Sequence, residues 1–204
     1  MRKISVPYGS RSQEAVIGDD IELQVIDLEK VPVEKTAEQM LREALDQPIG
    51  SAKLEDLVKP EDQVLIIVND HTRPGPYRIM VKEIVERLSN AGVTDSHIRF
   101  IIATGSHRAS TREEIAINIG QAYMDRFEVI VHCCTDPDSI VSIGQTQSGL
   151  PLYVNKAVVE SSFIITTGLI VPHHTAGFSG GRKSIVRYKV MYGGRGGGKS
   201  WAVA

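Results

Sequence analysis

The chain has 204 residues, of which 42% are hydrophobic and 24% are charged, and its formal net charge is -2. This length allows one large or two small domains with a substantial hydrophobic core. The balanced charge excludes recruitment to nucleic acid or to a membrane surface by bulk electrostatics, so a ligand has to be argued from local sites.

Short apolar runs alternate with helical patterns from about residue 35 onward. This alternation predicts an α/β fold with a mostly parallel sheet, flanking helices and ligand loops at the carboxyl ends of the strands. In chain order, we expect a helix over residues 36–45, a strand over 63–68, a helix over 77–92, a strand over 97–104, a helix over 110–119, a strand over 127–133, a strand leading into a helix over 150–161, and a strand over 163–171.

Local signals mark several of these boundaries. The first and third helices begin with sequences typical of a capping box, Thr36 with Gln39 and Ser110 with Glu113. The second helix is expected to stop at Gly92, because glycine readily adopts the backbone conformation that ends a helix. Residues 63–68 are apolar almost throughout, which is typical of a strand buried on both faces.

The two cysteines, Cys133 and Cys134, are neighbours in the sequence and cannot close a loop as the disulfides of secreted domains do. We expect them to pack at the end of a strand rather than to bind a metal. Residues 1–16 contain no apolar run typical of a secretion signal, and no segment approaches the roughly 18 apolar residues of a membrane span. These features predict a cytoplasmic protein without a membrane partner.

Three polar clusters each follow an expected buried strand. They read "NDHTRPGP" over 69–76, "TGSHR" over 104–108 and "PHHTAGFSGGRKS" over 172–184. The carboxyl ends of parallel strands meet at one edge of the sheet, where α/β folds bind their ligands. We therefore expect these three loops to converge on one site.

The residue types in these loops suit an anionic ligand with acid–base chemistry beside it. Glycines allow close approach of backbone amides, hydroxyls and cations hold an anion, and histidines exchange protons near neutral pH. The residues concerned are Gly105, Gly177, Gly180, Gly181, Thr72, Thr175, Ser179, Arg73, Arg108, Arg182, Lys183, His71, His107, His173 and His174.

Each cluster also has a plainer interpretation. Pro74 and Pro76 around Gly75 are typical of a turn, and Asp70 with Arg73 would form a local ion pair. A single histidine after a strand is more often a hydrogen-bonded loop residue than a catalyst. The coincidence of three such loops at one predicted edge favours the shared site.

Together, the three motifs resemble the N-terminal part of the nickel-dependent lactate racemase family, over approximately residues 1–185. The resemblance implies a racemase or epimerase of a 2-hydroxy acid such as lactate. It also implies a cofactor, the nickel pyridinium-3,5-bisthiocarboxylate mononucleotide, tethered to a lysine that Lys183 matches. In this family His107 and His173 match the two catalytic histidines, and the segment that lies against the cofactor matches Asp70, His71, Thr72 and Arg73.

The family mechanism, by this resemblance, uses the two histidines on opposite faces of the substrate. One removes the hydroxyl proton of the 2-hydroxy acid while its α-hydrogen moves to the cofactor as hydride. Hydride returns to the other face of the keto acid with the second histidine as acid, which gives the opposite stereoisomer. The implied ligand is therefore a small 2-hydroxy acid, and no nucleic acid is expected to bind.

The sequence departs from the family pattern after Ile185. The pattern continues through a Pro-Gly-containing segment to a histidine that binds nickel, whereas residues 186–204 read "VRYKVMYGGRGGGKSWAVA" with no histidine after His174. We therefore expect the chain to be a racemase fragment over 1–185, followed by a foreign tail over 186–204 without the nickel ligand.

This tail resembles the phosphate-binding loop of phage terminase large subunits. Its pattern runs from Gly193 to Gly198, with Lys199 as the phosphate lysine and Ser200 as the magnesium ligand. Such a loop needs a full helix after it and an acidic residue on another strand, and neither is expected in the remaining sequence. Two alternatives thus accompany the racemase interpretation: a P-loop ATPase fragment, and a non-catalytic module that binds a phosphorylated small molecule.

Overall fold

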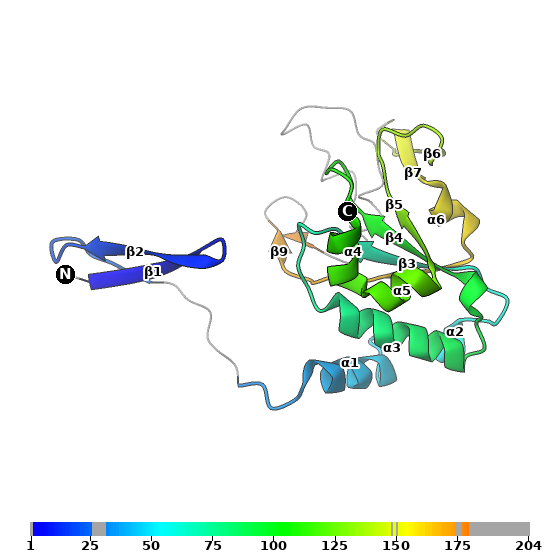
Figure 1. The fold of residues 1–204 in the computed structure, drawn as a ribbon, viewed down its shortest axis with the longest axis horizontal. Coiled ribbons are helices and arrows are strands. Elements are labelled where there is room, and N and C mark those ends of the chain that lie inside the picture. The colour runs from blue at the N-terminus through cyan, green and yellow to red at the C-terminus, as the bar shows by residue number, and fades with distance from the viewer. Residues whose placement is uncertain (1, 26–31, 148, 150, 174–176, 180–204) are drawn as a thin grey trace. The chain divides into compact units, whose positions relative to one another are not determined.

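The computed structural model of the chain describes residues 2–25, 32–147, 149, 151–173 and 177–179. It divides between Glu34 and Lys35 into two compact units. The second unit contains the helices and strands expected from the sequence, and Figure 1 shows its sheet with the surrounding helices.

The first unit contains an antiparallel hairpin that the sequence analysis did not predict. Strand β1 (Arg2–Tyr8) pairs along its whole length with β2 (Arg11–Ile17). The two-residue connection begins at Gly9, whose φ of 60° is a left-handed conformation that glycine adopts without strain. No described residue of this unit is buried, so the candidate site is sought in the second unit.

The second unit is built on a four-stranded sheet in which all neighbouring strands are parallel. Its spatial order is β5 (Glu128–Val131), β4 (Ile98–Ala103), β3 (Val64–Asn69) and β8 (Phe163–Thr166). Every residue of β3 is buried, because this strand is central and has packed layers on both faces. The α/β fold class expected from the sequence is confirmed.

One face of the sheet is covered by three helices that follow β3 and β4 in the chain. They are α3 (Tyr77–Asn90), α4 (Arg112–Ile119) and α5 (Gln121–Arg126). Alternate residues of the two central strands, such as Ile66 and Phe100, point into this layer and are fully buried. The ring of Phe100 packs edge-on against Phe127 at 5.5 Å, which anchors the end of α5 to the sheet.

The opposite face is covered by a hairpin and a short helix (Figure 1). The hairpin pairs β6 (Ile140–Gln145) with β7 (Pro151–Asn155), and α6 (Lys156–Glu160) follows directly. Leu65 and Ile67 point to this side, where they pack with residues such as Ala157. The sheet is therefore the middle layer, and its carboxyl edge remains accessible for loops.

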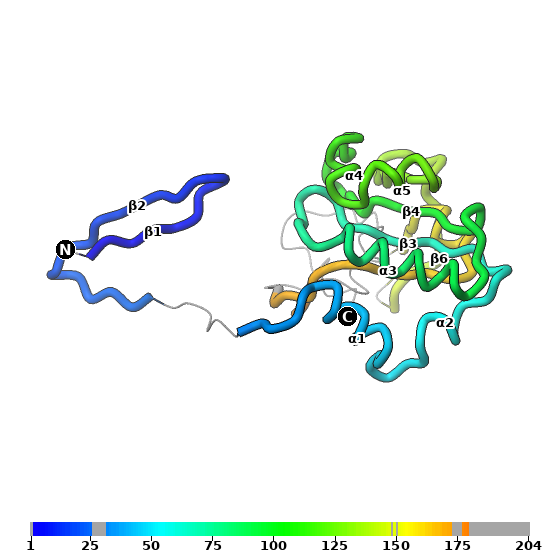
Figure 2. The backbone as a smooth tube through the Cα atoms, turned by 60° about the horizontal axis from the view of Figure 1, so that its bottom comes forward, coloured from blue at the N-terminus to red at the C-terminus, as the bar shows by residue number. Residues whose placement is uncertain are grey.

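Helices α1 (Ala37–Asp46) and α2 (Leu54–Leu57) pack against α3, as Figure 2 shows. Their contact includes the guanidinium of Arg87, a residue that is only 7% exposed. This group bonds to the carboxylates of Glu83 at 3.1 Å, Glu55 at 2.9 Å and Asp46 at 2.9 Å. The buried cation is thus fully paired and ties the three helices together.

Two of the predicted helix boundaries are confirmed. The hydroxyl of Thr36 accepts from the Gln39 amide, and the Gln39 side chain accepts from the Thr36 amide. At the end of α3, the amide of Val93 donates to the carbonyl of Leu88, and the amide of Gly92 donates to the carbonyl of Ser89. This is a Schellman motif, and it needs the φ of 88° that Gly92 adopts.

The third predicted boundary is wrong by one residue. Helix α4 is capped by Thr111 and Glu114 rather than by Ser110 and Glu113. The segment "STREE" satisfies the capping-box pattern in both registers. The observed register is favoured because Glu114 also pairs with Arg108 in the preceding loop.

The last strand is shorter than predicted. The sheet ladder ends at the pair of Ile67 with Thr166, and the amide and the hydroxyl of Thr167 both donate to the carbonyl of Ile67. In the part of the chain that the structure describes, no helix is long and apolar enough to cross a membrane.

Candidate functional site

The strand order places a topological switch point beside β3. The chain runs outward from β3 to β4 and β5, and then returns to place β8 on the other side of β3. Ligands of open parallel sheets bind at the carboxyl edge where the strand order reverses in this way. The loops that follow β3, β4 and β8 all begin at this edge, as the sequence analysis predicted.

A buried carboxylate and an imidazole join the first two loops. Asp70 follows β3 and is 0% exposed, whereas His107 follows β4 and its side chain is 40% exposed. Nδ1 of His107 lies 2.5 Å from Oδ2 of Asp70. Two predicted site residues that are 37 positions apart in sequence are therefore in direct contact.

Thr72 fixes the other oxygen of the same carboxylate. Its hydroxyl donates to Oδ1 of Asp70 at 2.7 Å, and its amide donates to that oxygen at 3.3 Å. The Thr72 hydroxyl oxygen also lies 3.3 Å from Nδ1 of His107. The carboxylate is thus oriented with one oxygen toward Thr72 and one toward His107.

This arrangement selects one tautomer of His107. A buried carboxylate accepts a hydrogen bond, so in the neutral ring the proton lies on Nδ1 and the lone pair on Nε2. A neutral imidazole held in this way is a general base at Nε2, and the carboxylate stabilises the imidazolium that forms when it takes a proton. The geometry therefore supports acid–base chemistry at His107.

A second set of contacts joins the same two loops. Nδ1 of His71 lies 3.4 Å from the hydroxyl of Ser110 and 3.6 Å from Oε2 of Glu114. Arg108 donates two hydrogen bonds to Glu114, at 2.6 and 2.8 Å. Arg108 and the amide of Thr111 lower the pKa of Glu114 to about 2, so this carboxylate is ionised at neutral pH. Glu114 was missed in the sequence analysis because the capping box was assigned one residue too early.

Neighbouring side chains hold the loop after β3 in place. The side-chain amide of Asn69 donates to the hydroxyl of Tyr77 at 2.9 Å, and the side-chain amide of Asn118 donates to the backbone carbonyl of Asn69 at 3.1 Å. Arg73 is exposed on the same loop, and its guanidinium donates to the carbonyl of Thr72 at 3.3 Å. An exposed cation and hydroxyl therefore lie beside the Asp70–His107 pair.

The loop after β8 forms a small hairpin at the same sheet edge. Strand β9 (Pro172–His173) pairs with β10 (Gly177–Phe178). The hydroxyl of Ser179 donates to the carbonyl of Leu169 at 2.7 Å and accepts from the amide of Val171 at 3.0 Å. The backbone of His173 thus lies in the predicted third loop.

Several predicted residues lie outside the described part of the chain. These are His174, Thr175, Gly180, Gly181, Arg182 and Lys183 of the third loop, and Gly193, Gly198, Lys199 and Ser200 of the phosphate-loop pattern. Their roles, like the division at residues 185 and 186, stay predictions.

The segment after β5 differs from its prediction. Cys133 is exposed and Cys134 is half-buried, so the expected packing of both thiols at the strand end is wrong. Strand β5 ends at Val131, and the buried residue there is His132 instead. The Thr104 hydroxyl donates to the His132 carbonyl at 2.5 Å, and burial lowers the pKa of the His132 imidazole to about 4. This histidine is neutral at pH 7, and its backbone carbonyl holds Thr104 at the start of the loop after β4.

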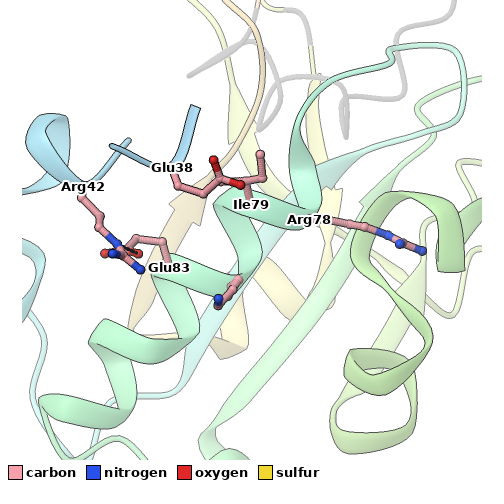
Figure 3. A pocket seen from close by; sticks show the side chains of 6 residues that line it. Glu38, Arg42, Arg78, Ile79 and Glu83 are labelled. Carbon is pink, nitrogen blue, oxygen red and sulfur yellow. Dashed lines mark hydrogen bonds and ion pairs between the residues drawn. The ribbon is translucent and has the colours of Figure 1, made fainter. Parts of the chain in front are cut away.

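A cavity of about 180 Å³ lies elsewhere, between α1 and α3 (Figure 3). Arg42 pairs there with Glu83 at 3.0 Å. Arg78 extends to α4, where it donates to the carbonyls of Ala116 and Ile117. The lining residues are Glu38, Arg42, Arg78, Ile79, Lys82 and Glu83. None of them belongs to the three loops, and the two arginines are engaged, so this cavity is not the candidate site.

The donor set of the loops bears on the cofactor that the sequence implies. Within the described ranges, no group of three or more histidine, cysteine or acidic side chains is placed to hold a metal ion. The exposed guanidinium of Arg73 suits an anionic group such as a phosphate or a carboxylate. The described loops therefore offer a cation for an anionic group, with the imidazole of His107 on the neighbouring loop.

Comparisons with known proteins show what the chain is similar to. A family model described as the lactate racemase N-terminal domain matches residues 8–187. The chain is 38% identical over 188 residues to a lactate racemase from Lactiplantibacillus plantarum, and 34% identical over 189 residues to one from Thermoanaerobacterium thermosaccharolyticum. Each match covers 91% of this chain and 44% of the relative, so the chain spans less than half the length of these curated relatives.

Solved structures give the same result for the fold. The lactate racemase apoprotein from T. thermosaccharolyticum is similar with a TM-score of 0.78 and 32% identity, over 92% of this chain and 44% of that chain. A protein from Thermotoga maritima, with a TM-score of 0.61 and 24% identity over 78% of this chain and 40% of its own, shares the fold.

Proposed function

Because this chain belongs to the lactate racemase N-terminal domain family, we propose that it forms the cofactor-holding, acid–base part of a 2-hydroxy acid racemase. The observation that carries the proposal is the hydrogen bond between Asp70 and His107 at the switch point of the sheet. It gives an exposed imidazole a defined tautomer beside the exposed guanidinium of Arg73.

The cofactor of this proposal is the nickel-pincer nucleotide. When bound, it supplies the acceptor for the hydrogen that leaves the α-carbon with its electron pair. Lys183 would tether it, and His71, Thr72 and Arg73 would lie against it. Asp70 would act through His107, because one of its oxygens contacts that imidazole.

The chain's own residues move the hydroxyl proton. Nε2 of His107 would accept the proton of the substrate hydroxyl, and Asp70 would stabilise the resulting imidazolium. His173, on the loop after β8, would perform the same task on the opposite face of the substrate. The exposed guanidinium of Arg73 would hold the carboxylate of the 2-hydroxy acid or an anionic group of the nucleotide.

The cofactor assignment predicts a covalent mark on Lys183. Protein isolated from cells that make the nickel-pincer nucleotide should yield a Lys183 peptide whose mass is raised by the bound nucleotide. Peptide mass spectrometry measures this directly, and Lys183→Ala should abolish the adduct. Lys156→Ala is the matched control, because Lys156 lies on α6, on the hairpin side of the sheet, and should leave the adduct unchanged.

An unmodified Lys183 peptide in protein that contains stoichiometric nickel would contradict the proposal that Lys183 tethers the cofactor. The same preparation also tests the P-loop alternative. That alternative requires magnesium-dependent ATP binding that is lost in Lys199→Ala and kept in Lys183→Ala.

A further inference from the structure

We propose that Glu114 is a positioning residue for the proton-transferring imidazole, because its carboxylate links the loop that carries His107 to the loop that carries Asp70. This inference rests on the proposed role of His107 and adds a residue to which the family resemblance gives no role. Its evidence is a set of contacts that runs parallel to the Asp70–His107 hydrogen bond.

The first half of the link fixes the loop after β4. Arg108 is the residue next to His107, and both of its terminal nitrogens donate to Glu114, at 2.6 and 2.8 Å. Two parallel hydrogen bonds hold the guanidinium in one plane, so they define the course of the loop as well as neutralising charge. Glu114 itself is anchored in the first turn of α4, where Oε2 accepts from the amide of Thr111 at 2.9 Å.

The second half of the link reaches the loop after β3. His71 is the residue next to Asp70, and its Nδ1 lies 3.6 Å from Oε2 of Glu114 and 3.4 Å from the hydroxyl of Ser110. The side chains of His71 and Glu114 are each 23% exposed, so water screens this contact only in part. The carboxylate therefore contacts both neighbours of the Asp70–His107 pair.

A helix cap alone does not require this residue. Glutamine at the same position keeps both bonds of the capping box, because its side-chain oxygen also accepts from the amide of the cap residue. It cannot provide the charge that Arg108 pairs with. Glu114→Gln therefore separates the link between the loops from the capping of α4.

The matched control is Glu113→Gln. Glu113 is exposed in the same first turn of α4, and the substitution removes the same charge from the same end of the helix. Its pKa is lowered mainly by hydrogen bonds within that turn. The control therefore changes the helix dipole interaction while leaving the link between the loops intact.

The test is solvent exchange of the Nδ1 proton of His107, measured by NMR on the whole chain. In Glu114→Gln, we expect this proton to exchange about threefold to fivefold faster than in the parent, because part of the loop anchoring is lost. Glu113→Gln should exchange at the parental rate. Arg108→Ala should reproduce the increase, and combining it with Glu114→Gln should add nothing.

Equal exchange rates in Glu114→Gln and Glu113→Gln would overturn the inference, as would full additivity of Glu114→Gln with Arg108→Ala. The measurement needs neither cofactor nor turnover. If exchange responds as expected while a complete racemase that contains this domain proves inactive toward 2-hydroxy acids, the positioning of His107 stands and the proposed function falls. If the protein racemises and exchange does not respond, only the role of Glu114 falls.

Discussion

Replacing Asp70 with asparagine is expected to invert the tautomer of His107 and to reduce racemisation about 10³- to 10⁴-fold. The Thr72 hydroxyl and amide both donate to Oδ1 of Asp70, so they would hold the amide oxygen of the new side chain in that place. Its NH₂ group would then occupy the position of Oδ2 and donate to Nδ1 of His107. The proton of the ring would move to Nε2, which could no longer act as a base.

Nitrogen-15 NMR of the histidine rings reads this change directly, because protonated and unprotonated ring nitrogens have well-separated shifts. The parent should carry the His107 proton on Nδ1, and Asp70→Asn should carry it on Nε2. Asp125→Asn makes the same chemical change on α5, where the carboxylate accepts from Gln121, and should leave His107 unchanged. An Nδ1 proton that persists in Asp70→Asn would refute the proposed orientation of the carboxylate.

Acidification is expected to destabilise the fold through His132. The pKa of this buried imidazole is lowered from 6.5 to about 4, so the folded state resists a proton that the unfolded chain binds readily. The stability that the neutral form contributes is complete above pH 6.5 and is lost as the pH falls toward 4. The loss should be on the order of 2 kcal/mol in the free energy of unfolding.

Urea unfolding at pH 7 and at pH 4.5 measures this loss. Carboxylates also titrate in this range, so the informative quantity is the difference between the parent and His132→Gln. Between pH 7 and pH 4.5, the free energy of unfolding of the parent should fall by on the order of 2 kcal/mol more than that of His132→Gln. His97→Gln, a change at a half-buried histidine that lies 3.2 Å from the carbonyl of Pro60, should keep the parental pH dependence. A parental pH dependence in His132→Gln would show that another group causes the loss.

Much of the second unit could be predicted from its sequence, because its strands are apolar runs and its helices carry explicit end signals. Residues 64–69 are buried throughout, and Gly92 ends α3 as expected. The first hairpin, β1 with β2, escaped prediction because its residues form no buried layer in this unit. Strand β6 escaped because its last four residues, from Ser142 to Gln145, are exposed and include only one apolar side chain, that of Ile143.

The site could be predicted in its position and residue types but not in its pairings. Thr72 and His107 were identified from their place after strands, which follows from the parallel sheet alone, whereas Asp70 was identified through the family resemblance. Their mutual contact depends on how two loops fold over the sheet edge, and no local pattern encodes that. Glu114 shows the same limit, because "STREE" permits two capping registers. Only contacts outside this segment, with Arg108 in the preceding loop and His71 in the loop after β3, distinguish them.

The most direct test of the account is the conversion of enantiopure L-lactate by a complete racemase that contains this domain and whose Lys183 is shown to carry the nucleotide. Chiral chromatography should detect D-lactate approaching an equal mixture. The conversion should be abolished in His107→Ala and kept in His97→Ala, which changes a histidine on the 3₁₀-helix Asp95–His97 before β4. A nucleotide-loaded racemase of this kind that leaves L-lactate unchanged, or a His107→Ala variant as fast as the parent, would contradict the account.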